Sequence, residues 1–475
     1  MSIALIWFRR DLRLDDHPAL QAALRAGHQI VPVYVHAPDE EASWSPGGAS
    51  LTWLRRSLMA LDASLREHGS RLLLRVGPSL AALEQLVIET GAEAIYWSRR
   101  YEPASIAADV VFKNALRKLG LRVESHNSAL LCEPWTVATQ QGDPYRVFTP
   151  FWRNAKAHLD ALSPKPAPAQ LPSVDAALAS ANIDALIPAP SPAWDAGFWK
   201  LWQPGEQGAH ARLAQCLGVL QSGYLEQRDR PDIYGTSMLS PHLHFGEISP
   251  HRIMHVLQSA QHDARSITNT DGYIRELGWR EFSHHLLYHF PQTTDANLNP
   301  RFGSFGWADP DAELLDAWKH GRTGIPLVDA GMRQLWQTGW MHNRVRMVVA
   351  SFLTKNLRMH WLHGARWFWD TLVDADLANN TQGWQWSAGT GADAAPYFRV
   401  FNPVSQAQRF DPDGAYVRRW ISGFEHLPDA ALFEPWKYPE LLARHAPNYP
   451  CAPIIDLKRS RETALAAYAA SRGRA

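Results

Sequence analysis

The feature that most constrains the fold is the alternation of two apolar patterns in the first third of the chain. Five short β-rich runs, IALIWF, IVPVYVHA, RLLLRVG, AEAIYWS and LRVESHN, alternate there with helical patterns. This alternation favours a parallel sheet with helices on its faces. Ligands of such sheets bind beyond the carboxyl ends of the strands, where residues 7–13 and 97–102 would lie. No G-x-G-x-x-G or P-loop motif follows a strand, so an ordinary dinucleotide or P-loop site is not expected.

The pattern changes after a stretch rich in proline and alanine at 161–204. Such a composition favours extended, solvated backbone, and we interpret the stretch as a linker running over the surface. From residue 210 onwards β-rich runs become rare and helical patterns dominate. The sequence therefore predicts an α/β protein in which a Rossmann-like parallel-sheet domain at 1–130 is followed by a linker at 131–205 and an all-helical domain at 206–475.

Composition limits the classes of partner and compartment. Lys+Arg and Asp+Glu both number 47, so any contact with nucleic acid must come from a local basic patch. Cys132, Cys216 and Cys451 form no C-x-x-C pair, which argues against a disulfide framework or a zinc site and favours a reducing compartment. The apolar run at 3–8 is too short for a signal peptide, and no stretch approaches the roughly twenty apolar residues of a membrane helix. We expect a cytoplasmic protein.

The segment from Trp336 to Trp386 combines tryptophans with arginines, aspartates and paired asparagines. A core would reject those charged and amide groups unless a polar group were bound among them, so we expect a flat cofactor with polar edges. GTSMLS at 235–240 offers hydroxyls, a glycine and backbone N–H groups suited to a pyrophosphate, although such residues also commonly cap helices. His251 and His255 lie four apart without a third ligand at zinc spacing, so no metal is expected.

Long stretches of the chain resemble the DNA photolyase and cryptochrome family, in the order in which the family has them. They are WFRRDLRLDDHPAL at 7–20, GTSMLSPHLHFGEISP at 235–250, YIRELGWREF at 273–282, the segment 336–386, and GWQWSAGTGADAAPYFRVFNPVSQAQRFD at 383–411. The resemblance is strongest to bacterial photolyases acting on cyclobutane pyrimidine dimers. It implies an antenna-binding α/β domain followed by a helical FAD-binding domain.

The resemblance also implies a set of FAD-binding residues. They are Tyr224, Thr236, Ser237, Met238, Leu239, Ser240 and Tyr273 along the phosphates and the rest of the cofactor, and Arg346, Asp374, Ala375, Asp376 and Asn380 around the isoalloxazine ring. Asp374 is expected to pair with Arg346, and the alternative for these two is a purely structural buried salt bridge. Asp376 is left for the polar edge of the ring. Asn380 matches the residue that faces flavin N5, where plant cryptochromes carry aspartate.

Trp384, Trp361 and Trp307 match the family's chain of electron-relaying tryptophans, from the flavin outwards. The alternative is that they are core residues, since the chain contains 21 tryptophans.

The resemblance further implies a lesion pocket and DNA contacts. The pocket wall comprises Glu276, Trp279, Asn343, Met347 and Trp386, and the DNA contacts comprise Arg228, Arg280, Arg344 and Gln406 together with Glu276 and Asn343. A flipped dimer calls for aromatic stacking plus hydrogen bonds from a carboxyl and an amide, which these residue types offer. Enzymes that repair the (6-4) photoproduct carry histidines in place of Asn343 and Met347, so a cyclobutane dimer is the expected lesion.

The function implied is light-dependent repair of such dimers by a deoxyribodipyrimidine photolyase, through electron transfer from excited reduced FAD to the flipped-out dimer. The alternative is a cryptochrome-type blue-light photoreceptor without repair activity. UV-damaged DNA, single- or double-stranded, is the expected partner of a monomeric protein. The antenna is expected to be methenyltetrahydrofolate, with a deazaflavin as the alternative. Arg100 and Glu102 are candidate antenna ligands, while Ser105 replaces the glutamate of one known folate-binding mode.

Overall fold

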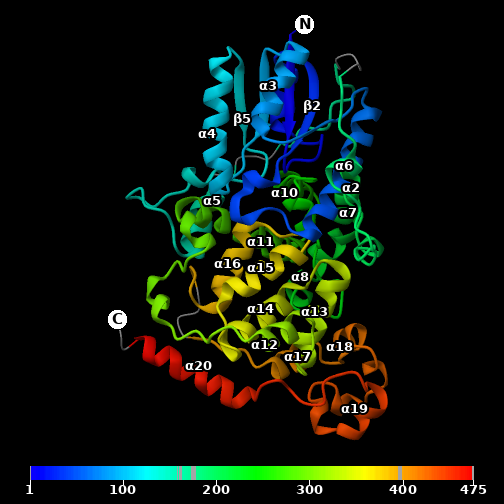
Figure 1. The fold of residues 1–475 in the computed structure, drawn as a ribbon, viewed down its shortest axis with the longest axis vertical. Helices are drawn as coiled ribbons and strands as arrows, with labels where there is room; N and C mark the ends of the chain where they lie inside the picture. The colour runs from blue at the N-terminus through cyan, green and yellow to red at the C-terminus, as the bar shows by residue number, and fades with distance from the viewer. Residues whose placement is uncertain (1, 158, 160–162, 173–177, 394–397, 473–475) are drawn as a thin grey trace. The chain divides into compact units, whose positions relative to one another are not determined.

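The computed structural model describes residues 2–157, 159, 163–172, 178–393 and 398–472. These residues form two compact units (Figure 1). Unit 1 comprises residues 1–145, 149–222 and 237–291, and unit 2 comprises residues 146–148, 223–236 and 292–475. The units group residues by proximity in space, so the domain boundaries at 130 and 205 stay a prediction from sequence.

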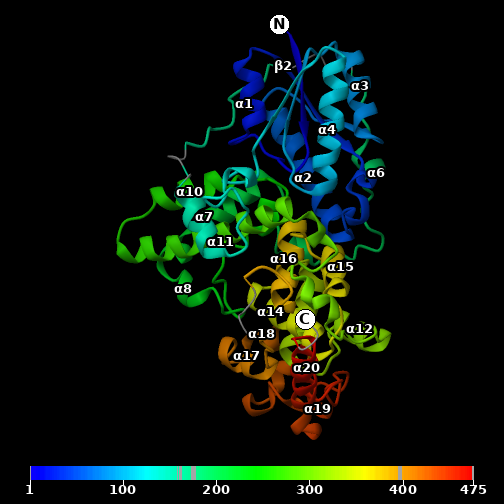
Figure 2. The same ribbon diagram turned by 90° about the vertical axis from the view of Figure 1, so that its left-hand side faces the viewer.

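Unit 1 contains the parallel sheet that the alternating pattern predicts. Its strands are β1 (Ile3–Phe8), β2 (Gln29–His36), β3 (Leu73–Val76), β4 (Ala94–Ser98) and β5 (Arg122–His126), in the spatial order β3-β2-β1-β4-β5 with every neighbouring pair parallel. The connecting helices are α1 (Pro18–Arg25), α2 (Gly48–Glu67), α3 (Ser79–Thr90) and α4 (Pro103–Lys118). Figure 2 shows α1 on one face of the sheet and α3 and α4 on the other. The predicted Rossmann-like fold is confirmed.

Burial on both faces explains why the strands are continuous apolar runs. In β1 every residue after Ile3 is buried, and all of β4 is buried. Trp7 and Trp97 pack edge to face within this core, with ring centroids 5.7 Å apart. The strand order reverses between β1 and β4, and in open parallel sheets a crevice for ligands forms beyond the carboxyl ends at such a reversal.

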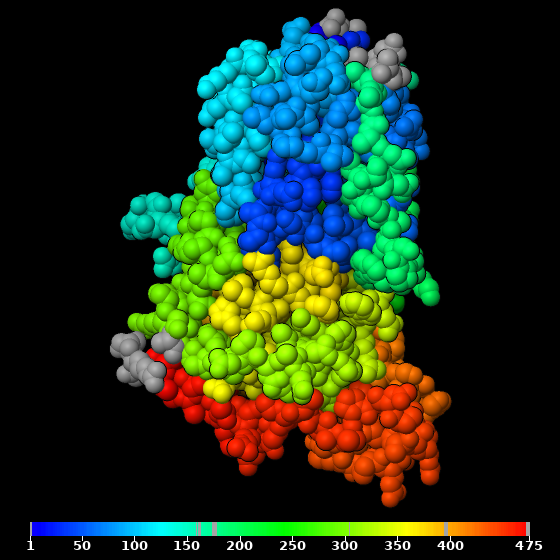
Figure 3. All heavy atoms as spheres, in the orientation of Figure 1, coloured from blue at the N-terminus to red at the C-terminus, as the bar shows by residue number. Residues whose placement is uncertain are grey.

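Residues 178–204, the later described part of the proline-rich stretch, run over the surface of unit 1 (Figure 3). Residues 180 and 181 lie alongside β3. The Ala181 amide donates to the Leu74 carbonyl at 3.0 Å, and the Leu74 amide donates to Ser180 Oγ at 3.0 Å. Because β3 is the last strand of the sheet on that side, these bonds occupy part of its free edge. The predicted linker also contains two helices, α5 (Phe148–Ala157) and α6 (Ile183–Leu186).

After β5, every regular element in the described part of the chain is a helix, so the predicted all-helical character of this region is confirmed. Unit 1 holds α7 (Glu206–Ser222), α9 (Ser240–His244), α10 (Pro250–Ser259) and α11 (Ala264–His289). Unit 2 holds α8 (Tyr224–Gln227), α12 (Ala312–Lys319), α13 (Pro326–Thr338), α14 (Asn343–Ser351), α15 (Trp361–Thr371), α16 (Leu377–Ala388), α17 (Pro403–Phe410), α18 (Ala415–Trp420), α19 (Pro439–His445) and α20 (Leu457–Arg472). Among the described residues, no helix is both long enough and apolar enough to span a bilayer.

The structure differs from the helical pattern at two places in unit 2. The pattern over 366–379 predicts one helix, but α15 ends at Thr371 and α16 begins at Leu377. The chain turns at Val373 and Asp374 between the two helices, and the Val373 amide donates to the Gly339 carbonyl at 2.8 Å. The second place is 352–356, where the helix continuing from α14 widens into a π-helical turn. Such turns in helices are frequent at functional sites.

Candidate functional site

The residues predicted to surround a flavin ring come together on α14 and on the break between α15 and α16. Arg346 donates to Asp374 Oδ2 at 2.8 Å and, through Nε, to the Met341 carbonyl at 2.7 Å. The Asp374 side chain is only 3% exposed, and its Oδ1 is buried without a hydrogen-bond partner among the residues that the structure describes. Because an unpartnered buried carboxylate oxygen is costly, a ligand that donates a hydrogen bond here fits the site.

Asp376 and Asn380 have defined orientations at the start of α16. Asp376 is the N-cap of this helix, and its Oδ1 accepts from the backbone and side-chain amides of Asn379 at 2.8 and 2.7 Å. Asn380 is buried, and its Nδ2 donates to the Ala365 carbonyl at 2.9 Å. Because that bond uses the amide as a donor, Oδ1 is left as the acceptor of the group. A buried acceptor that carries no charge suits the N–H group of a negatively charged ligand ring.

Five of the predicted FAD residues, Ser237 to Ser240 and Tyr273, lie in unit 1. The Tyr273 hydroxyl donates to Ser237 Oγ at 2.9 Å, and Ser237 Oγ also accepts from the Leu239 amide at 3.3 Å. Met238 has a φ of +54°, a conformation that non-glycine residues rarely adopt and that clusters at ligand-binding loops. The loop before α9 is therefore held in a specific shape by Tyr273. Tyr224, at the start of α8 in unit 2, is buried.

The predicted tryptophan relay lies entirely within unit 2. Trp384 is buried, and its ring meets Phe368 at 5.0 Å and Trp318 at 6.0 Å between centroids. Trp361 is fully buried and contacts His360 at 5.6 Å, and His360 contacts Trp307 at 5.1 Å.

Two packing details orient the indoles of this relay. Trp361 Nε1 donates to Asn297 Oδ1 at 2.8 Å. Gly364, one turn beyond Trp361 on α15, lies directly against the Trp384 ring. The three indoles therefore have fixed positions, and their role as an electron relay stays a prediction.

The residues predicted for the lesion pocket fall in both units. In unit 1, Glu276 and Trp279 are three residues apart on α11, and both are half-buried. In unit 2, Asn343 and Met347 are four apart on α14, with Asn343 exposed and Met347 half-buried, and Trp386 on α16 is half-buried. The helical spacing places each pair on one face of its helix, as the sequence predicts.

The arginines predicted to contact DNA also interact with other residues of the protein, each in a different way. Arg344 pairs with Asp229 at 2.8 Å and lies over the Phe410 ring at 4.3 Å. Arg228 lies over the ring of Tyr224 at 5.4 Å. Arg280, in contrast, donates to the Ala129 carbonyl at 2.8 Å and lies 3.2 Å from Glu281, so its guanidinium also has a structural role in unit 1.

Gln406 on α17 is buried, and its Oε1 has no hydrogen-bond partner within the described part of the chain. This unpartnered oxygen would accept a hydrogen bond from a ligand.

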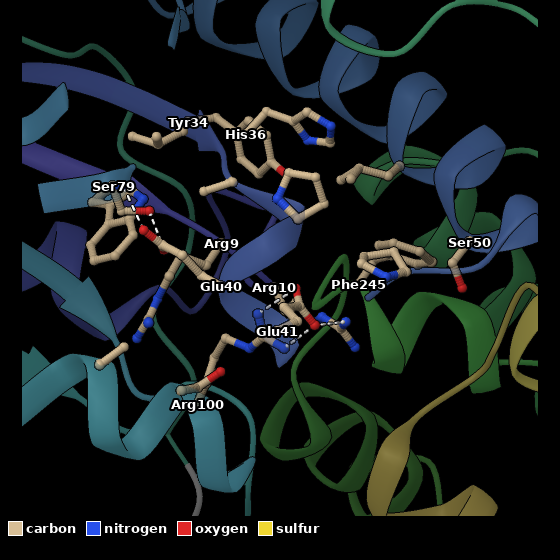
Figure 4. Close-up of a pocket in the computed structure, with 18 of the residues that line it drawn as sticks. Arg9, Arg10, Tyr34, His36, Glu40, Glu41, Ser50, Ser79, Arg100 and Phe245 are labelled. Atoms are coloured by element: carbon tan, nitrogen blue, oxygen red, sulfur yellow. Dashed lines mark hydrogen bonds and ion pairs between the residues drawn. The ribbon is translucent and has the colours of Figure 1, made fainter. Parts of the chain in front are cut away.

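A cavity in unit 1 lies beyond the carboxyl ends of β1, β2 and β4, where the parallel sheet predicts a ligand (Figure 4). Its lining includes Trp7, Arg9, Arg10, Tyr34, His36, Glu40, Glu41, Ser50, Ser79, Arg100, Ser105, Ala108, Phe112 and Phe245. The candidate antenna ligand Arg100 is therefore on the cavity wall. Glu102 is not among the residues that line the cavity, but it pairs with Arg100, with 2.9 Å between Arg100 Nη2 and Glu102 Oε1.

Three charged residues of the cavity wall, Arg10, Glu41 and Arg100, are paired with one another. The Glu41 carboxylate accepts hydrogen bonds from Nη1 and Nη2 of Arg100, both at 2.9 Å, and pairs with Arg10 Nη2 at 3.1 Å. Burial opposes the charge of Glu41, but Arg100 and Arg10 outweigh it and hold the pKa of this carboxyl below its usual value. Burial likewise raises the pKa of the Tyr34 hydroxyl. The wall thus combines aromatic rings with a fixed set of compensated charges, which suits a flat ligand with polar edges.

Sequence reasoning missed the part of this cavity that comes from β2. It considered the residues after β1 and β4 but overlooked Tyr34, His36 and Glu41. The signal was present, because the second β-rich run is parallel to the first and its carboxyl end must lie at the same edge of the sheet. His360, which contacts both Trp361 and Trp307, was also missed.

One further group of side chains brings oxygen and nitrogen ligand atoms together in unit 1. Asp15, Glu206 and His210 could in principle hold a metal ion. Both carboxylate oxygens of Asp15 already accept from Arg252, at 2.6 and 2.7 Å. The positive charge that a metal ion would bring next to Asp15 is therefore already supplied by the Arg252 guanidinium.

Comparisons with known proteins agree with this architecture. Residues 4–172 match a family model described as DNA photolyase, and residues 273–470 match one described as the FAD binding domain of DNA photolyase. The chain is 44% identical to a deoxyribodipyrimidine photo-lyase of Agrobacterium fabrum over 98% of its length and 97% of the relative's. It is 38% identical to cryptochrome-1 of Arabidopsis thaliana, covering 96% of this chain and 69% of that protein. Among solved structures, a bacterial class III photolyase from Agrobacterium tumefaciens matches with a TM-score of 0.94 and 43% identity, covering 100% of this chain and 98% of the other.

The chain thus has a parallel-sheet α/β part and a helical part that matches an FAD-binding domain. These features define a flavin-binding protein. The chain belongs to the DNA photolyase family, which confirms the resemblance seen in its sequence.

Proposed function

We propose that this protein is a deoxyribodipyrimidine photo-lyase that repairs cyclobutane pyrimidine dimers in UV-damaged DNA under blue or near-UV light. The observation that carries the proposal is the orientation of Asn380. Its Nδ2 is committed to the Ala365 carbonyl, so the side chain presents a neutral oxygen. A carboxylate at this position would face a negatively charged ring unfavourably, which is why an amide favours repair over photoreceptor function.

Bound, reduced FAD would supply the light-driven electron transfer that splits the dimer, and the residues assigned to it above would hold it. The protein's own residues hold and orient the reactants. Asp374, fixed by Arg346, offers its unpartnered Oδ1 to a donor on the cofactor. Tyr273 and Ser237 hold the loop that we assign to the phosphates.

The lesion is assigned from the side chains on α11, α14 and α16. Trp279 and Trp386 offer faces for stacking, and Glu276 and Asn343 offer hydrogen bonds to carbonyl and imide edges. Met347 adds an apolar, deformable contact. These side chains match a cyclobutane dimer better than a (6-4) photoproduct, for which the family uses histidines in place of Asn343 and Met347.

Repair of an oligonucleotide containing one thymine dimer tests the proposal. The purified, reduced protein is incubated with it under blue light and in darkness, and intact thymines are quantified. Repair only in the light is expected, and Trp386→Ala should repair much more slowly. If the flavin responds to light but the dimer persists, the protein is a photoreceptor of the cryptochrome type. Dark repair would exclude both.

We also propose that the unit 1 cavity holds the antenna chromophore, methenyltetrahydrofolate in preference to a deazaflavin. Its position beyond the strand ends and its aromatic, charge-paired wall support this assignment. Ala108→Phe should fill the cavity and abolish the near-UV absorption of a second chromophore while the flavin spectrum persists. Ala107→Phe, exposed on the same helix, is the matched control and should retain both chromophores. Equal chromophore content in the two variants would refute the assignment. The active species is expected to be a cytoplasmic monomer, which light scattering can test in part.

A further inference from the structure

The segment between α8 and the phosphate-loop residues forms a closed loop in unit 2. Its ends meet because Gly235 packs on Gln227, whose carbonyl oxygen lies 2.4 Å from the position that a Cβ on Gly235 would take. A side chain at 235 would therefore push the two ends apart. Inside the loop the Arg230 amide donates to the Gln227 carbonyl at 2.9 Å. The two ends of the loop formed by residues 228–234 therefore lie next to each other.

Ion pairs and hydrogen bonds attach this loop to two helices of the same unit. Asp229 pairs with Arg344 on α14 at 2.8 Å, and the Asp232 carbonyl accepts from Arg419 on α18 at 3.1 Å. Asp232 also accepts from Arg230 Nε at 2.8 Å. Because the loop is attached at both Asp229 and Asp232, its other side chains have a fixed orientation. Figure 2 labels α8, α14 and α18, between which the loop can be followed.

Among the side chains that this loop presents to solvent, beside the charged Asp229 and Arg230, two are apolar or aromatic. Tyr234 is 67% exposed, and Ile233 before it is 37% exposed. An exposed aromatic ring on a rigid loop loses little conformational entropy when it stacks on a ligand, because the loop is already ordered.

The chemistry around Tyr234 points to nucleic acid. The loop and the helices that hold it contribute Arg228, Arg230, Arg344 and Arg419, and Arg409 is exposed over the Phe410 ring at 5.0 Å. The aspartates of the loop fix some of these guanidiniums, but each arginine has five N–H donors and an ion pair uses only part of them. Arginines on and around a loop that also carries an exposed aromatic ring are a combination that binds single-stranded or unpaired nucleic acid.

We propose that Tyr234 stacks on an unpaired base of the bound DNA, beside the phosphates held by the loop arginines. This inference deepens the proposed repair function and rests on it. Extrusion of a dimer leaves bases without their partners, and a stacking ring would stabilise that opened strand whatever its sequence. Tyr234 would then favour damaged DNA over intact duplex without touching the lesion.

The test measures binding of a dimer-containing duplex that carries 2-aminopurine at successive positions near the lesion. Tyr234→Ala and Tyr234→Leu should bind about tenfold more weakly, which corresponds to the loss of one stacked base. Tyr234→Phe should bind like the wild type, because stacking needs the ring and not the hydroxyl. One 2-aminopurine position should change in fluorescence with the wild type and Tyr234→Phe only. The matched control is Tyr438→Ala, which removes a 38% exposed tyrosine elsewhere in unit 2 and should leave binding unchanged.

Salt dependence separates stacking from charge. Tyr234→Ala should keep the wild-type slope of affinity against salt concentration, whereas Arg228→Ala should flatten it. Wild-type affinity in Tyr234→Ala, or equal losses in Tyr234→Phe and Tyr234→Ala, would overturn the stacking role. If the wild-type protein itself fails to bind or repair the dimer, the proposed function has failed instead.

Discussion

Replacing Gly364 with alanine should move Trp384 and destabilise unit 2. A Cβ at 364 would lie 2.0 Å from Trp384 Cη2 and 2.4 and 2.5 Å from two further ring atoms. Carbon atoms in contact prefer about 3.5–4.0 Å, so the ring must shift by about 1.5 Å or more. Phe368 and Trp318 hold that ring on its other sides, at 5.0 and 6.0 Å between centroids, so little room is available.

The magnitude follows from two opposing effects. Overpacking a filled core costs about 1–3 kcal/mol, and this overlap belongs at the upper end. Alanine in a helix is about 1 kcal/mol more favourable than glycine, which offsets part of the cost. The expected net loss in the free energy of unfolding is therefore about 2 kcal/mol. Because Trp384 is also the first residue of the proposed relay, light-driven reduction of the bound flavin should slow as well.

Gly383→Ala is the matched control for this experiment. Gly383 is exposed within α16, and a Cβ there would meet no atom within 4 Å. The same substitution should thus stabilise the protein by up to about 1 kcal/mol. Urea unfolding of the two variants beside the wild type would measure both shifts. Similar shifts in both, or a Gly364→Ala protein as stable as the wild type, would refute the packing argument.

Three further predictions concern the relay, the cofactor site and the response to acid. Trp384→Phe should slow photoreduction of the flavin but leave light repair by chemically reduced protein intact; parallel loss of both would mean that the residue is structural. Asp374→Asn should weaken retention of FAD, measured by the flavin absorbance that survives gel filtration, because it alters the buried partner of Arg346. Burial lowers the pKa of His285 to about 4 from a usual 6.5, so the unfolded chain binds a proton between these pH values that the folded chain does not. Stability should therefore fall as the pH drops from 6.5 to 4, by at most about 3.4 kcal/mol from this group (a pKa difference of 2.5 at 1.36 kcal/mol for each), and His285→Gln should show a smaller fall in urea titrations at pH 7 and pH 4.5.

The sheet could be predicted from sequence because its determinants are local. Each of the five β-rich runs forms a strand, and the buried strands β1, β2 and β4 are almost continuous apolar runs, as burial on both faces requires. The helical positions of Asn343 and Met347 likewise follow from spacing alone. The relationship of Arg346 to Asp374 came from the family resemblance, and the structure confirms the contact.

Other features depend on tertiary contacts that spacing does not encode. The break at 372–376 looks helical by pattern, but the backbone there bonds to Gly339 and Asp376 caps the next helix. The π-helical turn at 352–356 was not predicted, nor was burial of Lys355 within it. Burial lowers the pKa of Lys355 to about 7, and its Nζ donates to the Arg399 carbonyl. A lysine in sequence normally indicates a surface position, so only the fold reveals this environment.

The hydrogen bonds between the proline-rich stretch and β3 have a consequence for solubility. An exposed edge strand offers its unpaired amides and carbonyls to strands of other molecules, and so promotes aggregation. Residues 179–181 occupy that edge through Leu74 and the adjacent Arg75. A proteolytic cut in this stretch would leave the sheet itself intact but uncover a template for intermolecular pairing. The stretch therefore protects the sheet edge as well as connecting one part of the chain to the next.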